Sequence, residues 1–240
     1  MPFDTSSRLP PQAASRPNVL VQGASDVERR FMASVYRWMT LGLALTAIVA
    51  TGVASTPWLL EAVVGNRLVF FGLIIAELGL VIAISAMVNR LSAAAAGGLF
   101  ALYSALNGAT LSVVLLAYTG TSVAAAFAVT AGTFFAMSLY GTVTKRDLTS
   151  WGSFLFMGLI GVVIASVVNI FLRSGMMSFV ISCASVVVFT GLTAYDTQKL
   201  RAIARAGGGS AAMPVNGALA LYLDFINLFL AVLRLFGNRR

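Results

Sequence analysis

Long apolar runs separated by short polar stretches dominate the chain. Each run has the roughly 20 residues that a helix needs to cross the hydrocarbon core of a bilayer. The runs are continuous rather than alternating with period two, so they predict helices and not the strands of a barrel. The pattern therefore predicts an all-α integral membrane protein, a bundle of seven transmembrane helices. The runs cover about residues 35–55, 67–89, 93–117, 121–143, 151–172, 176–197 and 217–236.

The first residues of the chain follow a different pattern. Residues 1–26 are polar, and Pro2, Pro10, Pro11 and Pro17 lie among Ser, Ala and Arg. Such a composition is typical of disorder, and this stretch has no apolar run that could serve as a cleaved signal peptide. The sequence predicts a disordered N-terminal tail over 1–26 and a seven-helix transmembrane domain over 27–240.

Composition agrees with a membrane protein and excludes several kinds of chemistry. Hydrophobic residues make up 59% and charged residues 10% of the chain, whereas a soluble domain is about a quarter charged. The chain has no histidine, which excludes His-metal sites and nucleophile–histidine triads. Cys183 is the single cysteine, so an internal disulfide cannot form.

The charges between the apolar runs predict the orientation. The basic residues gather on alternate sides of the runs, and this distribution explains the net charge of +8 better than nucleic-acid binding does. By the positive-inside rule the richer side is cytoplasmic, so the N-terminus is expected in the cytoplasm and the C-terminus outside. The richer side has Arg8, Arg16, Arg29, Arg30, Arg90, Lys145, Arg146, Lys199, Arg201 and Arg205; the poorer side has Arg67, Arg173 and, at the C-terminus, Arg239 and Arg240.

Three of the eight acidic residues lie inside apolar runs: Glu77, Asp196 and Asp224. A charged side chain at the middle of a membrane helix costs roughly 2.5–3.5 kcal/mol on insertion scales, so it usually has a function. Asp196 is near the cytoplasmic end of the sixth run. Asp224 follows Gly217 by seven residues, about 10 Å along the last helix. The two aspartates are therefore expected on the same half of the membrane, on consecutive helices.

Two carboxylates within hydrogen-bond reach cannot both ionise easily and tend to share one proton. Such a pair can respond to pH, hold a cation or activate water. Asn227 and Thr193 are the polar residues expected to support it, and Arg90 could pair with Asp196. With Glu77, the two aspartates are also the candidate cation ligands, because hard cations prefer oxygen donors. Each carboxylate could instead have a purely structural role at a helix end.

Several strings of the chain resemble the Bax inhibitor family, also called the transmembrane Bax inhibitor motif family, in its bacterial branch. The similarity extends from about residue 27 to the C-terminus. The strings are Phe31-Met-Ala-Ser-Val-Tyr-Arg-Trp-Met-Thr-Leu-Gly-Leu-Ala-Leu-Thr-Ala, Glu77-Leu-Gly-Leu-Val, Asn89-Arg90-Leu-Ser, Ala194-Tyr-Asp-Thr-Gln-Lys and Ala220-Leu-Tyr-Leu-Asp-Phe-Ile-Asn-Leu-Phe-Leu.

The resemblance implies that the last helix is central and surrounded by the others. It also implies a pH sensor made by Asp196 and Asp224 that gates a slow calcium leak, with Arg90 as the candidate lock of the closed state. Calcium would be transported or weakly bound, with no organic cofactor. The location implied is a bacterial inner membrane, and bacterial relatives are linked to a membrane-bound protease as partner.

Two other functions fit the same residues. One is a regulator of another membrane protein that transports nothing itself. The other is an intramembrane aspartyl protease, which has a Gly-x-Gly-Asp string at its second aspartate. This chain has Tyr222-Leu223-Asp224 there, without those glycines. We therefore expect a protein that is not an enzyme, with lipid and calcium as partners and no nucleic acid.

Overall fold

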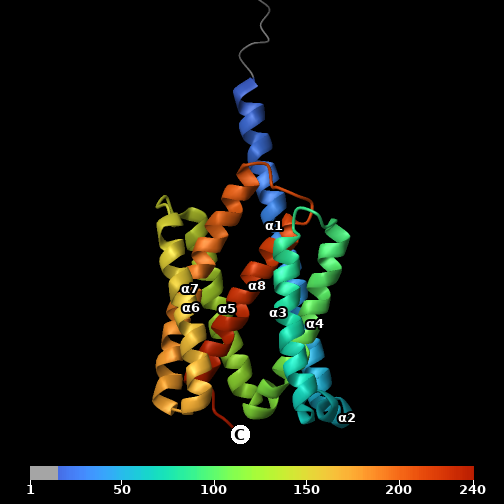
Figure 1. Cartoon of the computed structure of the whole chain (residues 1–240). Helices are drawn as coiled ribbons and strands as arrows, with labels where there is room; N and C mark the ends of the chain where they lie inside the picture. The colour runs from blue at the N-terminus through green and yellow to red at the C-terminus, as the bar shows by residue number, and fades with distance from the viewer. Residues whose placement is uncertain (1–15) are drawn as a thin grey trace, which may run out of the picture.

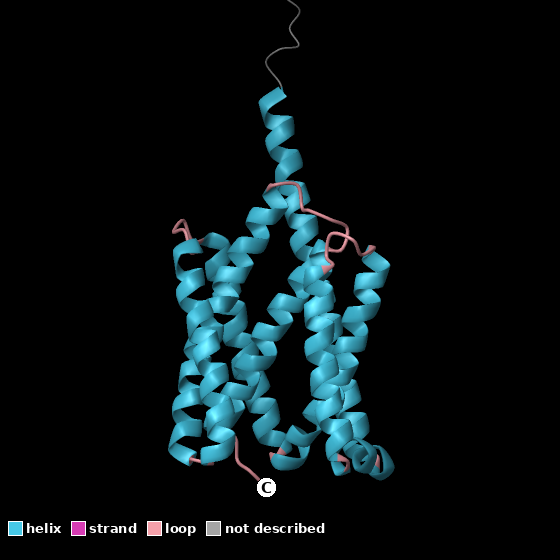
Figure 2. Ribbon diagram, viewed as in Figure 1, coloured by secondary structure: helices cyan, strands magenta, loops and turns pink. Residues whose placement is uncertain are grey.

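The computed structural model describes residues 16–240, and the side chains from Asp26 onward. This part of the chain is almost entirely helical, with short loops (Figure 2). The elements are α1 (Arg16–Ser55), α2 (Pro57–Leu60), the π-helix η2 (Glu61–Gly65), α3 (Arg67–Ala86), α4 (Ala93–Ala117), α5 (Gly120–Val143), α6 (Thr149–Leu172), α7 (Gly175–Arg205) and α8 (Met213–Phe236).

Seven of these helices are long and apolar enough to cross a membrane, which confirms the predicted architecture. They are α3 to α8 and the Asp26–Ser55 part of α1. Two spans are longer than the predicted runs: α7 continues to Arg205 instead of ending near residue 197, and the spanning part of α1 begins at Asp26 instead of near residue 35. The short α2 and η2, which join α1 to α3, were not predicted.

The structure describes only the last part of the predicted N-terminal tail. α1 begins at Arg16, so residues 16–26 are helical in the structure although the sequence predicts disorder over 1–26. The remainder of the predicted tail, residues 1–15, lies outside the described residues.

The bundle has two ends, which we call the N-side and the C-side. The N-side carries the start of α1 and the loops α3–α4, α5–α6 and α7–α8; the C-side carries α2, the loops α4–α5 and α6–α7, and the C-terminus. Figure 1 shows α1 projecting from the N-side and the C-terminus at the opposite end. Because the number of crossings is odd, the start of α1 and the C-terminus lie at opposite ends of the bundle.

The last spanning helix, α8, is central, as expected. In its spanning window 61% of the residues are buried, against 6% in α3 and in α6. α8 packs against α7, α1, α5 and α4, and runs obliquely through the bundle (Figure 1). α6 is peripheral and packs chiefly on α7. The outward faces of α3 and α6 carry exposed apolar side chains such as Phe71 and Phe171, as expected for surfaces that contact lipid.

Glycines allow the helices to approach closely at two crossings. A Cβ at Gly108 of α4 would lie 2.6 Å from the carbonyl oxygen of Thr46 on α1. A Cβ at Gly141 of α5 would overlap the backbone of Ala194 on α7. In lipid the hydrophobic effect does not drive helices together, so their association depends on close packing. Small residues at the contact allow that packing. The second crossing holds α5 against the part of α7 that carries Asp196.

The two last turns of α7 are held by α1. Glu28 accepts hydrogen bonds from the guanidinium groups of Arg201 and Arg205, the latter at 2.7 Å. After α7 the chain reverses at Gly207, Gly208 and Gly209, which all have positive φ. The reversal leads directly into α8, so the helices that carry the two aspartates are consecutive and antiparallel.

Candidate functional site: carboxylates inside the bundle

Asp224 lies in the middle of α8, inside the protein core. Its side chain is 4% exposed. Its Oδ2 atom is buried and accepts no hydrogen bond from any described residue. The neighbouring carboxylate whose charge acts on it is that of Asp196 on α7. A buried carboxylate oxygen without a donor is unusual, since buried polar atoms are nearly always paired.

Asp196 lies deeper in the bundle than the sequence predicts. Because α7 continues to Arg205, Asp196 is nine residues from the N-side end of its helix, about 14 Å. Asp224 is eleven residues from the N-side end of α8, about 16 Å. α7 and α8 pack against each other. The two aspartates are thus at matching levels on neighbouring helices.

No cation among the described side chains forms an ion pair with Asp224. Within residues 26–240 the ion pairs are Arg29–Asp26, Arg201–Glu28 and Arg205–Glu28. The charge of Lys199, three residues further along α7, acts on Asp196. An unpaired charge in a low-dielectric interior is costly. The pair is therefore a place where a proton or a bound cation stabilises the fold.

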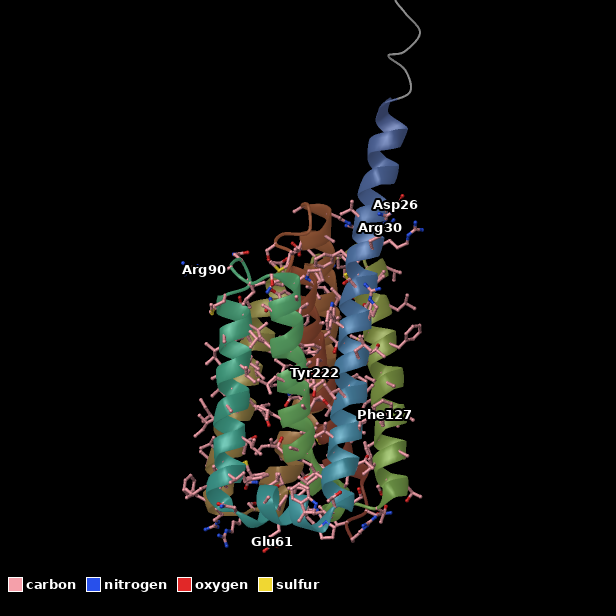
Figure 3. All side chains as sticks on the ribbon, turned by 90° about the vertical axis from the view of Figure 1, so that its right-hand side faces the viewer. Asp26, Arg30, Glu61, Arg90, Phe127 and Tyr222 are labelled. Atoms are coloured by element: carbon pink, nitrogen blue, oxygen red, sulfur yellow. The ribbon has the colours of Figure 1, made fainter. Side chains whose placement is uncertain are left out.

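Arg90 does not reach the aspartates in this structure. α3 ends at Ala86, and Arg90 follows it in an exposed turn. Figure 3 shows its side chain at the N-side, pointing away from the bundle axis. It belongs to none of the three ion pairs of the described chain. Its proposed role as a lock stays a prediction that requires another arrangement of the α3–α4 turn.

Asn227 and Thr193 each bond to their own helix. The Asn227 amide donates to the carbonyl oxygen of Leu223 at 2.8 Å. The Thr193 hydroxyl donates to the carbonyl oxygen of Phe189 at 2.8 Å. Neither side chain donates to a carboxylate of the pair here. Their predicted supporting role is therefore limited, in this arrangement, to the helix backbone beside the aspartates.

Glu77 belongs to a different polar cluster. Its carboxylate accepts hydrogen bonds from the Asn107 amide at 3.1 Å and from the Thr110 hydroxyl at 2.9 Å, both on α4. These bonds hold Glu77 between α3 and α4. The described residues contain no group of three or more Asp, Glu or Cys side chains that could hold a metal ion. The structure therefore does not combine Glu77 with the two aspartates in one cation site.

The cluster continues from Glu77 to the centre of the bundle through Tyr222. This side chain is completely buried, and its hydroxyl donates to Asn107 Oδ1 at 2.9 Å. It also lies 2.6 Å from the hydroxyl of Thr46 on α1, which can donate to the carbonyl oxygen of Ser104 at 2.9 Å. Figure 3 shows Tyr222 at mid-height in the bundle. One chain of hydrogen bonds thus connects α3, α4, α8 and α1.

This chain of hydrogen bonds can run in two directions. With Glu77 ionised, Thr46 donates to Tyr222, Tyr222 to Asn107 and Asn107 to Glu77. With Glu77 protonated and the Asn107 amide turned over, every donor reverses and Thr46 donates to Ser104. Amide and hydroxyl orientations are inferred from such networks. The cluster can therefore satisfy Glu77 in both protonation states.

A second cluster lies beside Asp196. The Tyr36 hydroxyl is 2.7 Å from the hydroxyl of Ser138, which is 2.9 Å from the hydroxyl of Thr197. These residues come from α1, α5 and α7. They fix the turn of α7 that carries Asp196. The sequence did not predict this cluster, because hydroxyl residues are frequent in apolar helices and the local sequence does not identify their partners.

Replacing Tyr222 by phenylalanine tests the larger cluster. The change removes one hydroxyl and leaves Asn107 and Thr46 without a shared partner inside the bundle. We expect a loss of about 1–3 kcal/mol in stability, measured as a lower midpoint of thermal unfolding in detergent. Tyr140→Phe is the matched control, since Tyr140 is exposed on α5. Equal midpoints for both variants would contradict a structural role of the cluster.

Comparison with known proteins identifies the family. Residues 28–240 match the family described as "Inhibitor of apoptosis-promoting Bax1", a range that includes nearly all of the seven spanning helices. The chain belongs to this family. The resemblance inferred from the sequence strings is thereby confirmed.

Relatives from several bacteria match over almost their whole length. The inner membrane protein YbhL of Escherichia coli (strain K12) is 50% identical over 230 residues, which cover 94% of this chain and 98% of the relative. An uncharacterized protein of Deinococcus radiodurans is 49% identical over 222 residues, with 91% and 94% covered. One of Borreliella burgdorferi is 44% identical over 218 residues, with 89% and 94% covered. The matches thus concern the whole bundle.

Proposed function

We propose that this protein is a pH-sensitive calcium leak channel gated by Asp196 and Asp224. The observation that carries the proposal is the buried Asp224 carboxylate, whose Oδ2 has no hydrogen-bond donor among the described residues and whose charged neighbour is Asp196. A group in this state binds a proton or a cation readily. Competition between the two for one pair of carboxylates makes ion passage depend on pH.

Calcium suits this site because it prefers carboxylate and carbonyl oxygens. Two aspartates supply too few ligands to bind calcium tightly. Weak binding is what ion passage requires, because the ion must also leave the site. Calcium is in this proposal the transported ion and not a resident cofactor. No organic cofactor is needed for such a leak.

The pair lies inside the bundle, below the N-side surface. A cavity of about 840 Å³ is open at the N-side, and Tyr195 and Lys199, on either side of Asp196 along α7, line it; its cations repel calcium, so we do not take it as the route of the ion. Beyond the pair the core around α8 is filled by apolar side chains such as Phe225 and Phe229. We take this arrangement as closed, and opening then requires α8 to move relative to its neighbours.

The alternative function is regulation of another membrane protein, such as a membrane-bound protease, without transport. The observation that favours it is the outward face of α3 and α6, where 6% of the residues in each spanning window are buried. These faces could dock against another membrane protein. An aspartyl protease is disfavoured, because Asp224 is enclosed and leaves no room beside it for a substrate strand.

Purified protein in calcium-loaded liposomes separates the two functions. A leak channel releases the trapped calcium at a rate proportional to the protein content, and protein-free liposomes do not. An indicator dye outside the liposomes reports the release. A regulator without transport leaves the calcium trapped, as in protein-free liposomes. This result would contradict the leak channel and favour the regulatory function.

We place the protein in a bacterial inner membrane, as the name of the Escherichia coli relative suggests, with the N-side in the cytoplasm. The excess of Lys and Arg in the N-side loops supports this orientation. Single cysteines at Arg30 and at Arg240, in a Cys183→Ser background, test it. In intact spheroplasts an impermeant maleimide should label the cysteine at Arg240 only. Labelling of the cysteine at Arg30 only would indicate the opposite orientation. Labelling of both cysteines would indicate an even number of crossings and would contradict seven.

A further inference from the structure

The N-side cavity is strongly basic. It lies between the α5–α6 loop and the last turns of α7 and has a volume of about 840 Å³. Thr142, Thr144 and Thr149 add hydroxyl groups to its lining. The cations that line it are Lys145, Arg146, Lys199, Arg201 and Arg205.

These cations are only partly neutralised. Glu28 binds Arg201 and Arg205, and Asp147 lines the cavity itself. Hydrogen bonds from the side chain and the backbone of Thr149 lower the pKa of Asp147, so it is ionised at neutral pH. Five cations therefore face two carboxylates, which leaves three positive charges unopposed. Lys145, Arg146 and Lys199 form no ion pair with the described residues.

The wall of the cavity is held in place. Gln198 of α7 accepts a hydrogen bond from the backbone N–H of Leu148 at 2.8 Å and donates one to the carbonyl oxygen of Arg146 at 2.9 Å. These two bonds fasten the α5–α6 loop to α7. Like charges in a flexible loop would move apart, so the clamp keeps Lys145 and Arg146 near the cations of α7. A preorganised group of cations is the usual device for binding a phosphate.

The cavity lies at the level expected for lipid headgroups. Trp151, in the first turn of α6, is 59% exposed, and Tyr140 near the end of α5 is 41% exposed. Trp and Tyr with exposed rings at the ends of membrane helices mark the interface between hydrocarbon and water. Both flank lining residues of the cavity, Thr149 and Gly141. A headgroup can therefore enter while its acyl chains remain in the bilayer.

We propose that this cavity binds the phosphate group of an acidic phospholipid, with Lys145, Arg146 and Lys199 as its main contacts. The chemistry would also accept a free phosphate or pyrophosphate from the cytoplasm. The position beside exposed Trp151 and Tyr140 favours the lipid. Binding would connect the α5–α6 loop to the part of α7 that carries Asp196, three residues before Lys199.

Native mass spectrometry of the purified full-length protein tests the proposal. The protein is titrated with equal amounts of phosphatidylglycerol and phosphatidylcholine, and separately with inorganic pyrophosphate. We expect phosphatidylglycerol to be retained over phosphatidylcholine. The Lys145→Gln/Arg146→Gln variant should weaken this retention on the order of tenfold, because each basic residue near a lipid surface contributes substantially to the attraction.

Two further variants keep the test specific. Arg30→Gln/Arg37→Gln removes the same charge from exposed positions of α1 outside the cavity and should retain phosphatidylglycerol like the wild type. Lys145→Arg/Arg146→Lys preserves the charge and should do the same. Equal retention by the Lys145→Gln/Arg146→Gln variant and the wild type would overturn the proposal. Preference for pyrophosphate over phosphatidylglycerol would overturn the lipid assignment.

Discussion

Asp196→Asn and Asp224→Asn are each expected to flatten the pH dependence of calcium release from proteoliposomes. Asparagine has nearly the shape of aspartate but cannot gain or lose a proton in this pH range. If the pair couples protonation to gating, the wild-type rate changes on the order of tenfold across the transition, as is common for coupled sites. Each variant should show a nearly constant rate over pH 5–8.

The double variant distinguishes a coupled pair from two independent residues. If Asp196 and Asp224 share one proton or one cation, loss of either disables the site. The effect of Asp196→Asn/Asp224→Asn should then be smaller than the sum of the single effects. Glu61→Gln is the control, because Glu61 is an exposed carboxylate on the C-side and should keep the wild-type profile (Figure 3). Wild-type profiles in both single variants would make the aspartates structural.

Gly141→Ala is expected to be the most destabilising single-methyl change in the bundle. The added Cβ would overlap the backbone of Ala194, which no side-chain rotation can relieve. α5 and α7 must then separate near Asp196. Overpacking of this kind costs about 1–3 kcal/mol, and the midpoint of thermal unfolding in detergent measures it.

Gly132→Ala is the matched control on the same helix. A Cβ at Gly132 would have no atom within 4 Å. Alanine is also the better helix former by roughly 0.5–1 kcal/mol, so this variant should be as stable as the wild type or slightly more stable. If Gly141→Ala is as stable as Gly132→Ala, the close contact between α5 and α7 is not present in the protein.

The sequence predicted the spanning helices well because lipid imposes a simple rule. Helices in a bilayer make all their backbone hydrogen bonds internally and present apolar side chains to the lipid, so each span is a long apolar run in the sequence. Outside the membrane a helix need not be apolar, so its ends cannot be predicted in this way. The last two turns of α7 carry Lys199, Arg201 and Arg205 and were predicted as loop, although Glu28 of α1 stabilises them as helix.

The candidate site was predicted in part. Charged residues are easily recognised inside apolar runs, so Glu77, Asp196 and Asp224 could be found without a structure. Their partners could not, because they depend on helix packing. Glu77 bonds to Asn107 and Thr110 of α4 and not to the aspartates.

Tyr222 and Arg90 show the same limit. Tyr222 is two residues before Asp224 and looks like an ordinary aromatic residue of the membrane, yet it is the centre of a buried hydrogen-bond chain. Arg90 was expected to face Asp196, but α3 ends four residues earlier and the turn exposes it. Where a helix ends and which way its turn points are set by neighbouring helices that the local sequence does not specify.

The central claim is that Asp196 and Asp224 control an ion leak, and the rate of calcium release from wild-type proteoliposomes across pH 5–8 tests it most directly. The account predicts release above that of protein-free liposomes, with a single transition in rate within this range. Release that does not exceed protein-free liposomes at any pH, or release at the same rate throughout, would contradict it.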